Sequence, residues 1–368
     1  MAIDSELIDA VVAGAADRER AGSLELGLVE RMRAAGVFSM LVPAALGGGE
    51  AEPAEVVATI EALAAADGAA GWCAGVGATA GLAAAYLPET EARELFGSPP
   101  AIAAGVFAPR GRLEAAGDGS FRLSGRWPLA SGIDHARVVG LGAVDPERGP
   151  LYAVVPCEAV AVEETWDSLG LRATGSHDVT ADGVEVAAAR VVDLAGGDPV
   201  APGPLYAFPL FGLLALSVSA VCTGIARGAL DDLRRVATER TPLGSRRSLA
   251  ERGTAQESVA AAEASLRAAR AGVDAAIATA WSKAEDGAAL GVEERVGLRL
   301  AATHAARASV AVVDLAHRLS GSGGLYRGVA ERRLRDVHTA AQHMIVAPAT
   351  FELAGRVLLG VQEDDPQL

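Results

Sequence analysis

Hydrophobic residues recur at helical spacing along the first hundred residues of the chain. Leu24, Leu28 and Met32 follow one another at intervals of four, which places them on one face of a helix, and the next segment repeats this pattern. Pro43 and the run of glycines after it interrupt the pattern, as such residues do between helices. We therefore predict an N-terminal helical domain over residues 1–100.

The pattern changes to short β-branched or alternating runs between residues 101 and 195. Phe121–Ser124 alternates apolar and polar side chains, and we expect it to pair with Arg112–Ala115 across a glycine-containing turn at 117–119. This region is predicted to form a central β domain, either a barrel or a sheet. Its other expected strands are Val138–Val144, Leu151–Val155, Val184–Val186 and Val191–Val192.

A segment rich in glycine and proline, residues 193–204, fits neither period and is predicted to be a linker. Each of the four segments after it has helical spacing and exceeds the average helix of about 11 residues. They favour a C-terminal four-helix bundle over residues 205–368, of a kind that often packs against other subunits. The expected helices are Pro209–Arg240, Leu249–Ala284, Val292–Ser320 and Ala330–Leu359.

One stretch in this third part, residues 208–225, is apolar enough to suggest a membrane span. Glycine, serine and threonine interrupt it, and no basic flank follows the positive-inside pattern, although spanning helices are continuous and carry positively charged cytoplasmic flanks. We predict a core helix, and no membrane as a partner.

Composition and charge narrow the class of protein. The 368 residues are 51% hydrophobic, which is enough material for a large buried core. The 47 acidic and 32 basic residues give a net charge of -15, which would repel nucleic acid. Three widely spaced cysteines without a C-x-x-C pair suit reduced thiols. Acidic residues stand where a signal peptide needs positive charge, so we expect a cytoplasmic protein.

The run from 125 to 136 carries the most informative chemistry. It places a hydroxyl, Ser131, and an imidazole, His135, near the ring of Trp127, where the strand that contains Phe121 is expected to end. Gly132 has no side chain to hold a ligand away from the backbone. We interpret the run as a binding site for a flat ligand.

The order of helical, β and helical parts, together with four motifs, resembles the acyl-CoA dehydrogenase superfamily. The resemblance implies an α+β fold with these three parts, a flavin cofactor and a homo-oligomer, expected to be a tetramer. The motifs are the Val-Pro turn within 41–48, the Gly-x-Arg-x-Thr turn within 166–176, the Arg-Thr-Pro-Leu-Gly segment at 240–244 and the Glu-Arg-x-x-Arg-Asp block at 331–336.

Within that superfamily the chain is more similar to the flavin-dependent monooxygenases. Phe107–Gly111, the run at 125–136, the glycine-rich segment at 320–326 and the block from Arg335 to His343 carry this similarity. Such enzymes take reduced flavin from a separate reductase, hold a peroxide on the flavin and hydroxylate aromatic or other organic substrates. The resemblance therefore implies a flavin reductase as partner and a small-molecule substrate.

The acyl-CoA dehydrogenases need a carboxylate base to remove a proton from the substrate. Aligned on the Arg-Asp block, the position of that base falls on Met344, with His343 beside it, and the alternative position falls near Leu214. Neither residue is acidic. Two alternatives remain: an FAD-bound acyl-CoA dehydrogenase that uses another base, for example Glu352, and a non-catalytic flavin-binding or interaction protein.

The resemblance also assigns residues to the site. Ser131 would hydrogen-bond near flavin N5, and His343 would lie over the ring as proton donor or base, with a core histidine as the alternative for His343. Trp72 and His135 would line the substrate pocket, although packing is the alternative role of Trp72. FAD and FMN both remain open, and we expect no metal site. The residues expected to bind the cofactor are Ser131, Trp127, Gly132, Thr174, Ser176, Arg240, Gly323 and Gly324.

Overall fold

The computed structural model describes residues 3–117, 119–239, 241, 246–365 and 367–368. The first part is helical, as predicted. Asp4 begins its first helix by accepting a hydrogen bond from the Leu7 N–H, and the Asp67 carboxylate does the same for the Ala69 N–H, so side chains satisfy otherwise unpaired N–H groups. The helices are α1 (Ser5–Ala13), α2 (Ala15–Ala21), α3 (Leu26–Ala34), α4 (Pro53–Ala66), α5 (Gly68–Gly81) and α6 (Glu89–Phe96).

A seven-stranded sheet follows, in the order β5-β6-β2-β1-β3-β4-β7. The predicted hairpin is confirmed, because Arg112 pairs with Ser124 and Ala115 with Phe121 in antiparallel register; Asp118 of its turn lies outside the described residues. Only β1 and β3 run parallel among the described strand pairs. The strands are β1 (Ala103–Ala115), β2 (Ser120–Ala130), β3 (Val138–Asp145), β4 (Gly149–Pro156), β5 (Ala161–Glu163), β6 (His177–Ala187) and β7 (Val191–Val192).

Long helices complete the chain, and three of the four predicted ones are continuous. The fourth is wrong as a single helix, because it is broken between Ala340 and Ala349. Pro348 lacks an N–H and disfavours helical backbone at the preceding residue, so the helix cannot continue through it. The break puts His343 at the start of a short 3-10 turn instead of inside a helix. The helices are α7 (Pro204–Ala207), α8 (Leu210–Glu239), α9 (Gly253–Glu285), α10 (Val292–Leu319), α11 (Val329–Ala340) and α12 (Ala349–Leu358).

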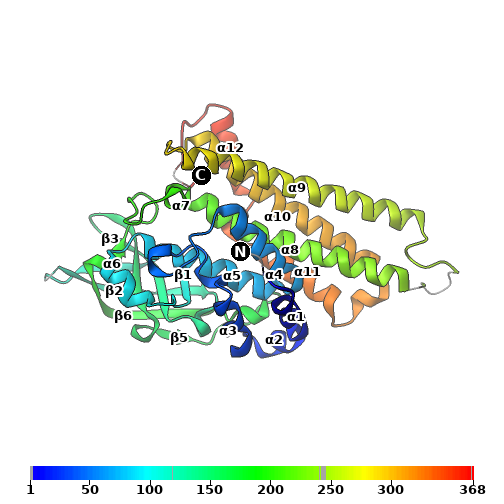
Figure 1. Ribbon diagram of the computed structural model, residues 1–368, viewed down its shortest axis with the longest axis horizontal. Helices are drawn as coiled ribbons and strands as arrows, with labels where there is room; N and C mark the ends of the chain where they lie inside the picture. The colour runs from blue at the N-terminus through cyan, green and yellow to red at the C-terminus, as the bar shows by residue number, and fades with distance from the viewer. Residues whose placement is uncertain (1–2, 118, 240, 242–245, 366) are drawn as a thin grey trace.

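The helical parts from both ends of the chain share one hydrophobic core. Ile60 of α4 and Leu216 of α8 belong to the same buried cluster, and Figure 1 shows α4 and α5 against the long helices, with the sheet at the opposite end of the molecule. By length and composition α8 could cross a membrane, but 78% of its apolar window is buried inside the protein. Its hydrophobic residues therefore serve the core, as the interruptions in the sequence predict.

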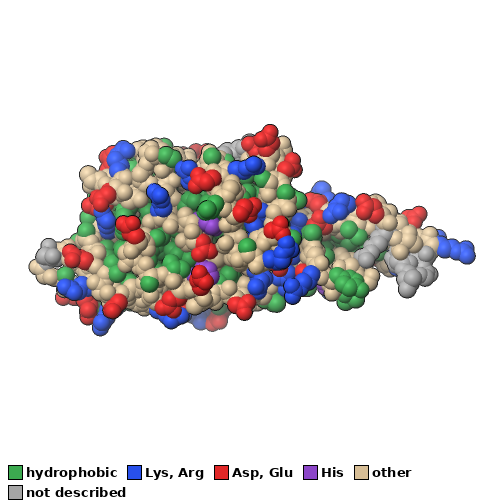
Figure 2. Space-filling view, turned by 90° about the horizontal axis from the view of Figure 1, so that it is seen from below, with side chains coloured by type: hydrophobic (Ala, Val, Ile, Leu, Met, Phe, Trp, Pro, Cys, Tyr) green, Lys and Arg blue, Asp and Glu red, His purple; other side chains and the backbone are tan. Residues whose placement is uncertain are grey.

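Charged side chains of both signs are spread over the face seen in Figure 2. Hydrophobic and histidine side chains are visible between them on the wide half of the molecule. This intermixing keeps a strongly acidic chain from presenting one broad field of single sign on this face.

Trp127 lies in the core of the sheet, which corrects its assignment to the cofactor site. Its side chain is fully buried, and its Nε1–H donates to the Gly142 carbonyl at 2.6 Å. Gly111 and Gly125 face each other across the hairpin and make the slot for the indole, because an added Cβ would lie 2.2 and 2.9 Å from ring atoms of Trp127. The tryptophan therefore holds β1, β2 and β3 together instead of facing a ligand.

Asp336 ties α11 to the loop before β6. The Leu171 N–H donates to its carboxylate at 2.6 Å, and Leu171 has a left-handed backbone with φ of 52°. Burial raises the pKa of Asp336 to about 7, with the nearby Asp67 adding to the effect against the Leu171 hydrogen bond. The carboxyl group is therefore protonated more readily in the folded chain than in the unfolded one.

The raised pKa predicts a pH dependence of stability. A folded-state pKa above the unfolded value of about 3.8 gives stability that is complete at low pH and is lost as pH rises through about 7. Across that window the free energy of unfolding should fall by roughly 2 to 4 kcal/mol more in the wild type than in Asp336→Asn. Urea titrations at pH 5, 6, 7 and 8 measure this, with the exposed Asp286→Asn as control. Parallel profiles for the wild type and Asp336→Asn would contradict it.

Candidate active site

Three hydroxyl groups meet beside the end of β2. Ser131 Oγ lies 2.7 Å from Ser176 Oγ, which lies 2.6 Å from Thr174 Oγ1. The three side chains are buried, with exposed fractions of 6%, 3% and 2% for Ser131, Ser176 and Thr174. Thr174 belongs to a 3-10 turn (Arg172–Thr174), and Ser176 immediately precedes β6. Three residues predicted to bind the cofactor are thus in direct contact.

Gly132 completes this cluster through its backbone. Its N–H donates to the Thr174 carbonyl at 2.8 Å, and it has a positive φ of 72°, a conformation that glycine adopts without strain. No atom lies within 4 Å of the position that a Cβ would take. The backbone is therefore open here, as the approach of a flat ligand requires.

Trp72 links the hydroxyl cluster to His343. Its Nε1–H donates to Ser131 Oγ at 2.9 Å, and its indole contacts the His343 imidazole edge-on, with ring centroids 5.8 Å apart. α5 supplies this tryptophan from the N-terminal part of the chain, whereas His343 comes from the break after α11. Residues from all three parts of the chain therefore form one site.

His343 is an exposed residue beside Trp72, although neighbouring groups remove part of its ring from solvent. Its Nδ1 accepts a hydrogen bond from the Ile345 N–H at 3.3 Å, so the neutral ring carries its proton on Nε2. Burial lowers its pKa, and the positive charge of Arg299 lowers it further. The imidazole is therefore held neutral at neutral pH.

Arg299 on α10 fixes the turn that carries this histidine. It is buried and donates to the Ile345 carbonyl at 2.6 Å and to Thr350 Oγ1 at 3.3 Å. Burial lowers the pKa of Arg299 to about 10. No pattern along the chain points to this residue, because only the tertiary fold brings residue 299 next to residue 345.

Leu129 is a second residue that the sequence interpretation missed. Strict alternation would put it on the same side as Trp127, inside the sheet. The β2–β6 register shifts between Trp127 and Ala130, and Leu129 has a positive φ of 66° and an exposed fraction of 61%. A leucine held in this unfavourable conformation next to Ser131 presents an apolar surface beside the hydroxyl cluster.

His135 lies close along the chain but shares no hydrogen bond with the cluster among the described residues. Burial lowers its pKa, against the opposing charge of Asp134. Its Nδ1 is buried and has no hydrogen-bond partner in the described part of the chain. An unpartnered buried ring nitrogen is costly, and a bound ligand would satisfy it.

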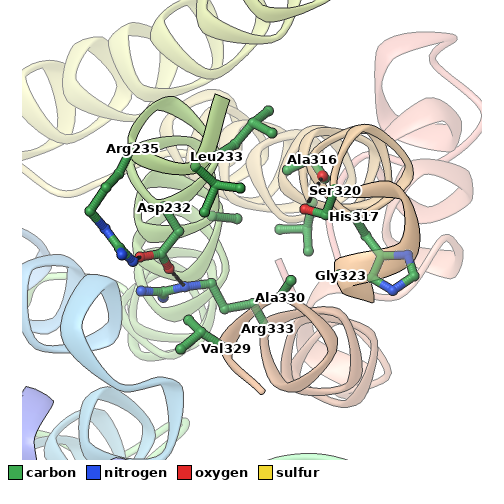
Figure 3. A pocket seen from close by; sticks show the side chains of 13 residues that line it. Asp232, Leu233, Arg235, Ala316, His317, Ser320, Gly323, Val329, Ala330 and Arg333 are labelled. Atoms are coloured by element: carbon green, nitrogen blue, oxygen red, sulfur yellow. Dashed lines mark hydrogen bonds and ion pairs between the residues drawn. The ribbon is translucent and has the colours of Figure 1, made fainter. Parts of the chain in front are cut away.

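Gly323 and Gly324, also predicted to bind the cofactor, lie in a 3-10 segment (Gly321–Leu325) between α10 and α11. Gly323 lines a cavity of about 230 Å³ between α8, α10 and α11, shown in Figure 3 beside the ion pair of Asp232 and Arg333. The Gly324 carbonyl hydrogen-bonds to His317 at 3.1 Å, and a Cβ on this glycine would collide with that ring. Among the described residues no hydrogen bond joins these glycines to Ser131, and Arg240 lies outside the described residues.

None of the positions considered for a carboxylate base places an acid beside the hydroxyl cluster. Glu352 is exposed and pairs with Arg356 on the surface of α12. Leu214 packs against the helical core, and Met344 is exposed beside His343. Within the described residues no group of three metal-ligating side chains is placed to hold an ion.

The residues around the hydroxyl cluster fit a flavin. An isoalloxazine ring has flat apolar faces and an edge of nitrogen and oxygen atoms, so it needs an apolar surface next to polar groups. Leu129 and Trp72 offer the apolar surface, while Ser131 and the open backbone at Gly132 offer the polar groups. The unpartnered nitrogen of His135 adds a further polar group for a ligand in the same region.

Comparison with known proteins agrees with this geometry. The family model for the acyl-CoA dehydrogenase C-terminal domain matches residues 216–348. The chain is 36% identical to indole-3-acetate monooxygenase of Pseudomonas putida over 96% of this chain and 93% of that protein. It is 30% identical to the oxygenase component of the FADH(2)-dependent resorcinol hydroxylase of a Rhizobium species, over 95% and 93%.

Solved structures show the same fold. XiaF from a Streptomyces species, in complex with FADH2 and glycerol, superposes with a TM-score of 0.90 at 25% identity, covering 99% of this chain and 97% of that one. The 3-HSA hydroxylase of Rhodococcus sp. RHA1 reaches the same TM-score at 22% identity and the same coverage.

Fold and family match together define a flavoenzyme with the acyl-CoA dehydrogenase architecture, which confirms the predicted fold class. The chain belongs to the flavin-dependent monooxygenases built on that architecture. It is therefore an oxidoreductase with a flavin cofactor, and the resemblance drawn from its motifs is confirmed.

Proposed function

We propose that this chain is the oxygenase component of a two-component system that hydroxylates a small aromatic substrate with reduced flavin from a separate reductase. The observation that carries the proposal is the connection from Ser131 through Trp72 to His343. This connection joins a hydroxyl, an indole and a neutral imidazole, and no described carboxylate bonds to any of the three side chains. The named relatives act on indole-3-acetate and resorcinol, which supports an aromatic substrate.

The residues divide the work. When bound, reduced flavin supplies the electrons with which dioxygen is activated. Ser131 would hold the polar edge of the ring, and Leu129 would support its face. Trp72 closes the space between the hydroxyls and the imidazole and excludes water from it. His343 holds or moves a proton at Nε2, since its Nδ1 is occupied by the Ile345 N–H.

An acyl-CoA dehydrogenase is disfavoured by the same geometry. That reaction needs a carboxylate beside the flavin, and Glu352 is instead paired with Arg356 at the surface. A neutral imidazole beside Trp72 suits proton transfer near neutral pH, which hydroxylation requires.

The proposal also includes an oligomeric state, a homotetramer, and a cellular location, the cytoplasm. Exposed hydrophobic side chains at the end of α12, among them Leu358 and Leu359, support packing of copies into a homotetramer. Cys73, Cys157 and Cys222 are free thiols, which supports a cytoplasmic location. FAD and FMN both fit the proposed site, and titration with each distinguishes them.

Reconstitution tests the function. The purified chain, a flavin reductase, NADH and either FAD or FMN are mixed with indole-3-acetate or resorcinol under isotopically labelled dioxygen. We expect a hydroxylated product that contains one labelled oxygen atom and forms only when all components are present. Flavin binding without oxygen-dependent turnover of any aromatic compound would favour a non-catalytic protein. Dehydrogenation of an acyl-CoA would favour the dehydrogenase.

A further inference from the structure

The hydrogen bonds of the hydroxyl cluster run in one direction, because the groups at its two ends can each play a single role. At one end, the Trp72 indole N–H can only donate, and it donates to Ser131 Oγ at 2.9 Å. At the other end, the Leu171 carbonyl can only accept, and it receives the Thr174 hydroxyl hydrogen at 2.9 Å. The hydrogens between these ends are fixed by counting.

Each hydroxyl has one hydrogen to give. Thr174 donates its hydrogen to the Leu171 carbonyl, so its oxygen must accept the hydrogen bond of 2.6 Å from Ser176. Ser176 thereby donates its own hydrogen to Thr174, so its oxygen must accept the hydrogen bond of 2.7 Å from Ser131. Ser131 is then left without a free hydrogen. It has two acceptor positions, of which Trp72 occupies one, so one acceptor position remains.

Burial keeps this direction in place. The three hydroxyls are almost inaccessible, and Ser131 is the most exposed of them. The Leu171 carbonyl also accepts from the Thr174 N–H at 3.1 Å and from Trp166 Nε1 at 3.3 Å. Reversing the chain would nevertheless leave Thr174 Oγ1 and the Leu171 oxygen 2.9 Å apart with no hydrogen between them, which is unfavourable because their lone pairs repel. The free position of Ser131 is therefore an acceptor, and the cluster ends there.

We propose that Thr174 and Ser176 act as positioning residues that make Ser131 an acceptor only, so that the site selects reduced over oxidised flavin at N5. This inference rests on the proposed function, which puts Ser131 at the polar edge of the flavin ring, and on the resemblance, which puts it near N5. The N5 atom of reduced flavin carries a hydrogen and can donate it to Ser131. In oxidised flavin N5 carries only a lone pair, which would face the lone pair of Ser131.

Dissociation constants for both forms of the flavin test the proposal. They are measured for FMN and FAD, oxidised in air and reduced under anaerobic conditions, by fluorescence or calorimetry. In Thr174→Val the Ser176 hydrogen loses its acceptor and can turn to Ser131, whose own hydrogen is then free to face N5. We expect oxidised flavin to bind about five- to tenfold more tightly and reduced flavin to bind more weakly by a similar factor.

Ser176→Ala is the second variant and covers the case in which Thr174→Val fails to fold. It frees the Ser131 hydrogen without adding a donor, so oxidised flavin should bind about five- to tenfold more tightly while reduced flavin changes little. A merely structural role for either residue would weaken both forms together. Tighter binding of the oxidised form is therefore the signature of the directed chain.

Ser124→Ala, in the first half of β2, is the matched control, since its hydroxyl accepts from the Gly183 N–H away from the cluster. It should leave both constants unchanged. If Ser131→Ala weakens reduced flavin but Thr174→Val and Ser176→Ala keep the wild-type ratio, the directed chain is overturned while the proposed function stands. If Ser131→Ala changes neither constant, Ser131 is not beside the flavin and the placement itself fails.

Discussion

Replacing His343 with asparagine is expected to separate flavin oxidation from hydroxylation. The imidazole is the titratable side chain that contacts Trp72, and its pKa is lowered by burial and by Arg299. Removing a positioned proton-transfer group costs on the order of a hundredfold in rate. Reduced flavin should still react with dioxygen, but the product formed per NADH should fall by at least tenfold while hydrogen peroxide accumulates.

Simultaneous assays of NADH, product and hydrogen peroxide measure this effect. His338→Asn is the matched control, because His338 lies five residues earlier and pairs with Asp314 at 2.8 Å. The control should keep the wild-type ratio of product to NADH. Full coupling in His343→Asn would show that the imidazole is a structural cap of its turn and has no part in proton transfer.

Much of the architecture could be predicted from local patterns. The hairpin register of β1 and β2 follows from alternation and a glycine turn, and the long helices α8, α9 and α10 follow from their period. The fourth predicted helix was wrong because its helical period continues across Pro348, whose missing N–H breaks it. That break gives His343 its place, so the least predictable part of the bundle supplies a central residue of the site.

The site was partly predictable for a similar reason. Ser131, Thr174 and Ser176 lie in turns at strand ends, where short sequence motifs determine backbone shape. Leu129 was missed because a β-bulge reverses the side that alternation assigns to it. Arg299 acts through the Ile345 carbonyl, 46 positions further along the chain. Contacts of this range depend on packing between helices, which no local pattern specifies.

Replacing Trp127 with alanine is expected to destabilise the sheet strongly, and this prediction separates its two assignments. A fully buried tryptophan exchanged for alanine costs about 3 to 5 kcal/mol, and the slot between Gly111 and Gly125 would be left as a cavity. Trp127→Phe should lose less, about 1 to 2 kcal/mol, because the ring still fills the slot while the hydrogen bond to the Gly142 carbonyl is lost.

Urea denaturation monitored by circular dichroism measures these losses, and flavin titration of the folded fraction tests the competing role. If Trp127 supported the cofactor, Trp127→Ala would keep the wild-type unfolding midpoint and bind flavin more weakly. The structure predicts the opposite result: Trp127→Ala lowers the unfolding midpoint, and Trp127→Phe binds flavin as tightly as the wild type does. Both follow from an indole that is fully buried against Gly111 and Gly125 and hydrogen-bonded to the Gly142 carbonyl.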